Sequence, residues 1–456
     1  MTTTPTTANP NAAALEPIRQ RFRAVETAAP SPWVRSLRQT GLDGFAALGF
    51  PTLQHEDWRY TNVAPITRLP FAPATPVAVN GAESQLIAES IFADLPGHRL
   101  VFVNGEFSPQ LSRLLPLAPG VRLENLAAAL TSDTGAALIQ PHLGRYAAAA
   151  GNAFTALNQA FFTDGAFIHV PANLTLTDPV ELIFITSGQQ DGQAIQPRNL
   201  IVAGANSRLT IVESYLSTGS GSYFTNAVTE IVAGDNAHVE HVKLQDEATG
   251  SFHIAAIGGH FGRTSHTRIH SLALGARLSR NNIRVNLAGE GLESVLNGLY
   301  LTRGEQLADH HMIVEHAQPH CASHEYFNGI LDDQSKGVFH GRILVREIAQ
   351  KTDAKQTNKN LLLSDRATAD TKPQLEIYAD DVKCTHGATI GQLNPESLFY
   401  LRSRGLNTDT AKRMLVHAFA GEIIERIQEP SVRQTIDQLV WDRLEANPHL
   451  ADLRHV

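Results

Sequence analysis

The sequence predicts a mainly β protein whose core is a β-helix, a solenoid of short stacked strands, between helical regions at its two ends. Short runs rich in β-branched residues follow one another from about residue 165 to about residue 390. A motif inside this region recurs after 30 residues. Amphipathic helical patterns precede and follow it. Together these three observations favour a β-helix flanked by helices.

The N-terminal region begins with a helix signal. Ser31 is a good cap residue, and Pro32 suits the first helical position, where its missing N–H costs nothing. Apolar residues then recur at helical spacing until Gly41, where we expect the helix to end. Residues 68–84 are rich in proline and alanine and are predicted to form a connection. Residues 100–109 are typical of two short strands joined by an Asn-Gly turn.

The central region lacks any helical pattern of about ten residues, which excludes a βαβ architecture and leaves a sandwich, a barrel or a solenoid. Residues 202–207, VAGANS, are matched by residues 232–237, VAGDNA, and an alternating strand follows each copy. A looser third copy occurs at 287–291. Repeats of about 20 to 50 residues built from short strands are typical of solenoids. Chance similarity of two turns is the alternative explanation.

The C-terminal region is predicted to contain three helices. Asn394 caps the first, which ends at Gly405. The second opens at Thr408, and the third opens at Ser431. Their apolar stripes suit either docking of a partner or capping of the solenoid, and the periodicity alone favours neither.

The predicted organisation is a disordered tail at 1–14, an N-terminal helical or mixed domain at 15–135, a β-helix at 136–392 and a C-terminal helical domain at 393–456. We expect no membrane span, because there is no run of about 18 apolar residues. The formal net charge of −8 argues against nucleic-acid binding. The chain has two cysteines, which fit a reducing cytoplasm better than a disulfide framework.

Several catalytic motifs are absent from the sequence. There is no G-x-x-x-x-G-K-[ST] phosphate-binding loop, so we expect no ATP hydrolysis by this chain. There is also no Rossmann glycine motif after a strand, no G-x-S-x-G elbow and no H-E-x-x-H helix. The sequence therefore predicts no enzyme of these classes.

Cys384 and His386 form one candidate metal site. In an extended strand their side chains would point to the same face, with Cα atoms about 6.6 Å apart. Lys383 would favour the thiolate, which is the ligating form of cysteine. Two ligands are too few for zinc or a cluster, so the others would come from another chain or from exogenous thiols. A buried structural cysteine beside a hydrogen-bonded histidine is the alternative.

A second candidate is a stretch dense in imidazole, a ligand that iron and zinc both accept. Residues of strands and turns at such spacings point to different faces, so ordinary core and surface histidines are the favoured explanation. The residues concerned are His310, His311, His316, His320, Cys321 and His324.

The most specific stretch of the chain is 337–406, which contains AQKTDAKQTNKNLLLS and then PQLEIYADDVKCTHGAT. It resembles the SufB/SufD family of iron–sulfur cluster assembly proteins. Residues 50–63, FPTLQHEDWRYTNV, and 101–112, VFVNGEFSPQLS, are similar to the SufD branch, and the cysteine-rich features of SufB are absent.

The resemblance implies a right-handed parallel β-helix and a scaffold subunit with no turnover of its own. It implies pairing with SufB through the β-helices and a nascent cluster at the SufB–SufD junction, where His386 would face a SufB cysteine. Cys384 matches the cysteine of the same motif, and Thr385 stands where serine is common. No cofactor would be bound stably by this chain alone.

The resemblance further implies that a SufC ATPase docks on the C-terminal helices. The residues expected to contribute to this docking are Phe399, Tyr400, Arg402, Arg404, Met414 and Phe419.

Two other functions compete with this one. A SufB-like scaffold could build clusters unaided as a homodimer, but two cysteines make that difficult. A polysaccharide-acting β-helix enzyme would need clustered acids in a groove and is usually secreted. We expect no signal peptide here, because the first residues contain no arginine and no apolar core of that kind.

Overall fold

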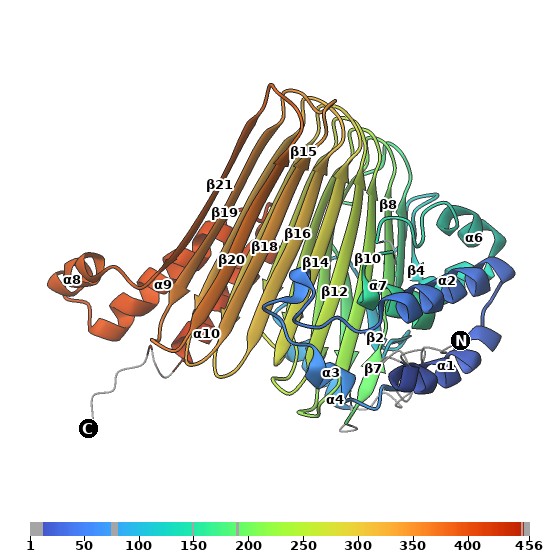
Figure 1. The fold of residues 1–456 in the computed structure, drawn as a ribbon, viewed down its shortest axis with the longest axis horizontal. Helices are drawn as coiled ribbons and strands as arrows, with labels where there is room; N and C mark the ends of the chain where they lie inside the picture. Colours follow the sequence, from blue (N-terminus) through green and yellow to red (C-terminus); the bar gives the residue numbers. More distant parts are fainter. Residues whose placement is uncertain (1–11, 74–80, 148–149, 188–190, 448–449, 451–456) are drawn as a thin grey trace, which may run out of the picture.

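The fold is a solenoid in which two parallel β-sheets face each other across about eight turns (Figure 1). The computed structural model describes residues 12–73, 81–147, 150–187, 191–447 and 450. The predicted parallel β-helix between helical ends is confirmed.

From β8 to β21 the strands alternate between sheet A and sheet B along the chain. Sheet A contains β1 (Ala72–Pro73), β4 (Arg122–Asn125), β5 (Ala166–Val170), β7 (Gln193–Ile195), β8 (Arg198–Ala203), β10 (Phe224–Ala233), β12 (Phe252–Phe261), β14 (Leu278–Leu287), β16 (Leu307–His316), β18 (Lys336–Val345) and β20 (Thr368–Ile377). Sheet B contains β2 (His98–Val103), β3 (Glu106–Phe107), β6 (Val180–Thr186), β9 (Arg208–Ser217), β11 (His238–Asp246), β13 (His266–Ala273), β15 (Glu293–Thr302), β17 (Ala322–Leu331), β19 (Asp353–Leu362) and β21 (Lys383–Gly391).

The repeat seen in the sequence marks a turn where coils stack closely. Val232 on β10 lies opposite Val202 on β8. A Cβ atom on Gly234 would lie 2.8 Å from a backbone nitrogen of the turn below, so only glycine fits there. Asn206 and Asn236 both adopt a positive φ, and the Asn236 amide donates to the Asn206 side chain at 2.9 Å. The recurring Gly and Asn therefore reflect coil-on-coil contact.

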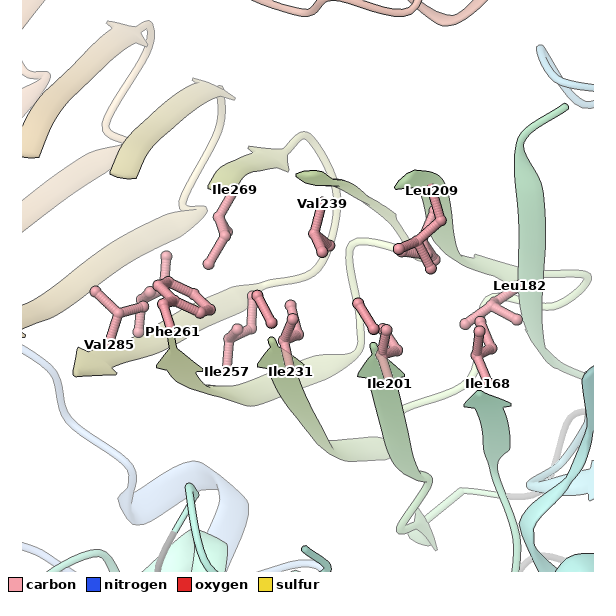
Figure 2. Packing of buried hydrophobic residues seen from close by; sticks show 14 of the residues in the cluster. Ile168, Leu182, Ile201, Leu209, Ile231, Val239, Ile257, Phe261, Ile269 and Val285 are labelled. Carbon is pink, nitrogen blue, oxygen red and sulfur yellow. The ribbon is translucent and has the colours of Figure 1, made fainter. Parts of the chain in front are cut away.

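The space between the sheets is filled by apolar side chains from both (Figure 2). Ile168, Ile201 and Ile231 occupy matching positions on successive strands of sheet A and point inward. Leu209 and Val239 point toward them from sheet B (Figure 2). All five are buried, and this column of branched residues is the main source of hydrophobic stabilisation for the first coils.

Helices cover the outer faces of both sheets. The N-terminal set, with α2 and α7, packs on sheet A, and α9 with α10 packs on sheet B. The helices are α1 (Ala12–Thr27), α2 (Pro32–Leu48), the 3₁₀ helix η1 (Glu56–Trp58), α3 (Ala64–Thr67), α4 (Gly81–Glu89), α5 (Leu126–Thr131), α6 (Asp133–Ile139), α7 (Ala153–Phe161), α8 (Pro395–Ser403), α9 (Thr408–Ile424) and α10 (Pro430–Glu445).

Buried carboxylates fasten both helical layers to the solenoid. Glu230 on β10 pairs with Arg198 at 2.8 Å and accepts hydrogen bonds from the backbone N–H groups of Gly144 and Tyr146, both at 2.7 Å. On sheet B, Glu240 accepts from the N–H groups of the turn at residues 428–429 before α10. Each carboxylate is satisfied by groups of the segment that it holds, which offsets the cost of its burial.

Most local predictions agree with the structure. The hairpin at 100–109 is formed by β2 and β3, with Asn104 and Gly105 both at positive φ. Asn394 caps α8 by accepting from two backbone N–H groups. Among the described residues, no helix is long and apolar enough to span a membrane.

Other local predictions need correction. The helix expected to end at Gly41 continues to Leu48, because Gly41 lets α2 lie against α7, where a Cβ atom would come within 2.6 Å of the Ala160 nitrogen. Of the predicted tail at 1–14, residues 1–11 lie outside the described residues, and the rest belongs to α1. The segment assigned to the N-terminal domain also supplies β2, which pairs with β6 in sheet B.

The interior also contains a buried acid near the C-terminal end of the solenoid. Glu325 on β17 points inward and accepts a hydrogen bond from Gln356 at 2.6 Å. Burial raises the pKa of Glu325 to about 8, so the folded protein holds it protonated at neutral pH.

We expect Glu325→Gln to stabilise the isolated chain at pH 8 by at least about 1 kcal/mol. In the wild type the unfolded chain releases this proton above pH 4.5 and the folded protein releases it only near pH 8, so stability falls as the pH rises between these values. The gain should therefore shrink toward pH 4.5. Urea unfolding at both pH values measures it, and an equal gain at both would contradict the assignment.

Candidate functional site

The C-terminal end of the solenoid is open. Within the described residues, β20 and β21 are the last strands of their sheets and each pairs with a neighbour on one side only. Residues of β21 are exposed or half-buried throughout. Unpaired backbone groups along such an edge can accept another strand.

Cys384 and His386 lie on β21 at this open end. They stand opposite Ala354 and Gln356 of β19, whose inward face they continue. Cys384 is half-buried against the apolar cluster that closes the last coils, and His386 is exposed. The two side chains therefore share the inward face of a strand that no further coil covers in this chain.

A polar ladder lies behind His386. Glu325, Gln356 and His386 occupy matching inward positions on β17, β19 and β21. Glu325 and Gln356 were not predicted from the sequence, because the residues of β17, β19 and β21 were not aligned with one another. The spacing is 31 residues from Glu325 to Gln356 and 30 residues from Gln356 to His386, which matches the repeat of the earlier coils and would have identified the ladder.

The prediction that Cys384 favours the thiolate is wrong for the isolated chain. Burial raises the pKa of the Cys384 thiol, and the nearby acids Asp353 and Glu325 raise it further. Lys383 is exposed and its position on the strand alternates with that of Cys384, so its charge does not outweigh these effects. The thiol is therefore protonated at neutral pH.

Cys384 and His386 are two candidate ligands without a described third. No third described histidine, cysteine, aspartate or glutamate joins them in a group whose ligand atoms lie within 4.8 Å of one another. A zinc ion or an iron–sulfur cluster would need about two more ligands from outside this chain.

The side chains of the histidine-rich stretch point to different faces, as the alternation of side chains along a strand predicts. His310 points inward and stacks on Tyr300 with ring centroids 5.4 Å apart, and its burial lowers its pKa to about 3. His316 also points inward, where it hydrogen-bonds to Ser323, and Cys321 is buried. His320 lies in a turn. His324 lies on the outer face of sheet B, and His311 lies on the outer face of sheet A.

The residues expected to dock an ATPase fall into two groups. Phe399 and Tyr400 on α8 are 73% and 56% exposed, and α8, which extends past the end of the solenoid, buries no residue at all (Figure 1). Arg402 and Arg404 at the end of α8 are also exposed, as is Met414 on α9. Phe419 differs from these, because it packs against the apolar cluster between α9 and sheet B.

Family comparisons cover almost the whole chain. Residues 184–419 match the family described as the SUF system FeS cluster assembly, SufBD core domain, and residues 18–182 match the SufBD protein N-terminal region.

Similar individual proteins support the same family. A SufBD family iron–sulfur cluster assembly protein of Synechocystis is 37% identical over 415 residues, covering 88% of this chain and 89% of that protein. The iron–sulfur cluster assembly protein SufD of Escherichia coli is 31% identical over 408 residues, covering 89% of this chain and 92% of that protein. The protein of the same name from Bacillus subtilis is 28% identical and covers 63% of this chain and 65% of its own length. With the open-ended solenoid, these similarities lead to one conclusion: the chain belongs to the SufBD family of iron–sulfur cluster assembly proteins, as a SufD-type member.

Proposed function

We propose that this chain is a scaffold subunit without ATPase activity. In this proposal it pairs with a SufB-type subunit through the open end of its solenoid and contributes His386 to the place where a nascent iron–sulfur cluster forms. The cluster is cargo of the assembly, and the other ligands come from the partner.

The observation that carries this proposal is the uncovered last coil. Ile390 on the inward face of β21 is 48% exposed, and Ile377 on β20 is also exposed. Open strand edges beside apolar residues favour pairing with another β-strand protein, because pairing satisfies the backbone and covers the apolar surface at once. A second solenoid stacked on this end would cover His386 and Cys384 together.

His386 suits a contribution to such a junction. His386 is exposed at the edge, so a ligand from a partner can approach its ring, and the backbone pairing of β21 with β19 fixes the strand that carries it. The Cys384 thiol needs to lose its proton before it can bind a metal, which makes His386 the readier ligand at neutral pH.

We expect His386→Ala to lower cluster formation several-fold in the complex with SufB and SufC, because it removes one ligand and no packing. Anaerobic assembly followed by visible absorption, iron and sulfide analysis measures the effect. Thr385→Ala, on the opposite face of the same strand, is the matched control and should retain activity. Unchanged assembly by His386→Ala with an unchanged melting temperature would remove His386 from the mechanism.

A second candidate function is a homodimeric scaffold that builds clusters unaided. One observation favours it: two copies joined at their open ends would supply two thiols and two imidazoles, which is enough for one cluster. Anaerobic reconstitution of the isolated chain separates the candidates. Near-stoichiometric iron and sulfide on a dimer would favour the homodimer, and little bound iron favours the heteromeric scaffold.

We also propose α8 as the docking site for a SufC-type ATPase. Its exposed aromatic pair and the arginine beside it, with the Arg404 guanidinium 5.2 Å from the Tyr400 ring centroid, have the composition of an interface anchor.

We expect Phe399→Ser to reduce ATPase co-purification at least tenfold while SufB still co-purifies, since α8 packs on α9 and Phe399 is not part of a strand. Ile348→Ser, at an exposed apolar residue in a solenoid turn, is the control for a general loss of surface hydrophobicity. Equal ATPase recovery with both variants would place the docking site elsewhere.

A further inference from the structure

Two histidines face each other on the outer surface of sheet A. His311 on β16 and His340 on β18 occupy directly opposed positions, and their ring centroids lie 4.3 Å apart. Their side chains are only 8% and 10% exposed. The pairing of two strands therefore holds two nearly buried imidazoles together.

A carboxylate from a distant part of the chain completes the group. Asp57 lies on η1, and its Oδ1 atom is 3.9 Å from Nε2 of His311 and 3.9 Å from Nδ1 of His340. One ligand atom from each residue lies within 4.8 Å of the others. These distances are too long for hydrogen bonds, so the three groups converge without bonding one another.

The segment carrying Asp57 is fixed to the sheet. Arg280 donates from Nη1 to the Asp57 carbonyl oxygen at 2.8 Å, and its guanidinium lies 3.8 Å from the Trp58 ring centroid. Thr61, a few residues later, donates to Asp309 at 2.5 Å. The backbone at Asp57 is therefore held in place while its carboxylate stays exposed and able to turn.

The hydrogen bonds leave a free lone pair aimed at Asp57. His340 Nε2 lies 2.6 Å from the Gln374 amide oxygen, which can only accept, so Nε2 carries the proton. In the neutral tautomer with the proton on Nε2, the nitrogen with the lone pair is Nδ1, which faces Asp57. Metal-ligating histidines are commonly oriented in this way by a second partner. On His311 the nitrogen near Asp57 is Nε2, and the other nitrogen, Nδ1, has no hydrogen-bond partner among the described residues, so this ring lacks a second partner of that kind.

The neighbouring cations do not neutralise Asp57. Each nearby cation has its own acid: Arg280 pairs with Asp309 at 2.5 Å, Arg342 with Glu376 at 3.3 Å, and Lys372 with Glu56. Two imidazoles and one exposed carboxylate therefore converge without a close cation of their own.

We propose that Asp57, His311 and His340 bind a divalent transition-metal ion of the Zn²⁺ or Fe²⁺ class. Two histidines and one carboxylate are a common ligand set for these ions, and the groove beside them leaves further coordination positions for solvent or another ligand. Ligand bonds of about 2.1 Å would bring the ligand atoms to about 3.4 Å from one another. A small rotation of the exposed Asp57 carboxylate would shorten both of its 3.9 Å distances to the histidine nitrogens.

The test uses the full chain without an affinity tag, stripped of metal by a chelator and titrated anaerobically with Co²⁺. We expect about one Co²⁺ per chain, with visible d–d absorption that Zn²⁺ abolishes by displacement. Asp57→Asn and His340→Ala should abolish this signal. His260→Ala is the matched control, because His260 lines the same groove but lies outside the ligand group, and it should bind like the wild type.

Two further variants make the result decisive. Gln374→Leu keeps all three ligands and removes the partner of His340, so we expect affinity to fall by about 10- to 100-fold. The double variant Cys384→Ser/His386→Ala should retain the Co²⁺ signal, which separates this site from the cluster site proposed above.

Asp57→Asn replaces an exposed side chain with one of the same shape, so this variant should still fold. Absence of Co²⁺ and Zn²⁺ binding by the wild type, or equal binding by Asp57→Asn, overturns the proposal.

Discussion

The backbone pairing of each coil with the coil before it is the constraint on which the rest of the structure depends. Every inward and outward position is fixed by this register, because side chains alternate along a strand. It aligns Glu325 and Gln356 behind His386, and it places His311 against His340. A slip of one residue in β21 would turn His386 to the outer face and break the polar ladder.

The packing of the helical layers on the sheets also depends on this register. Each packs apolar side chains on the outer face of one sheet and is fastened by a buried carboxylate, Glu230 or Glu240, that binds backbone N–H groups of the covering segment. Such contacts specify one arrangement of helix on sheet, because a shifted helix would leave a buried charge unsatisfied. The layers cover the faces of the solenoid and leave its last coil open.

Features that depend on neighbouring residues could be predicted from the sequence. The Asn-Gly hairpin, the Asn394 cap and the VAG-x-N turns each carry their own local signal. Gly41 was misinterpreted as a helix end because its reason lies in a contact with α7, more than a hundred residues away. The pKa of Cys384 depends on the packing of the last coils, and the approach of Asp57 to two histidines depends on how η1 crosses sheet A. Neither has a local signal.

The open end links burial to chemistry at Cys384. Half-burial already raises the pKa of this thiol in the isolated chain. A partner strand stacked on β21 would remove more water and raise the pKa again, unless a cation arrived with it. Metal binding to a thiol releases its proton, so the positive charge of iron would offset the cost of burying a thiolate at a closed junction. Closure of the solenoid end and ligation by Cys384 would therefore favour each other, whereas closure without metal would keep the thiol protonated.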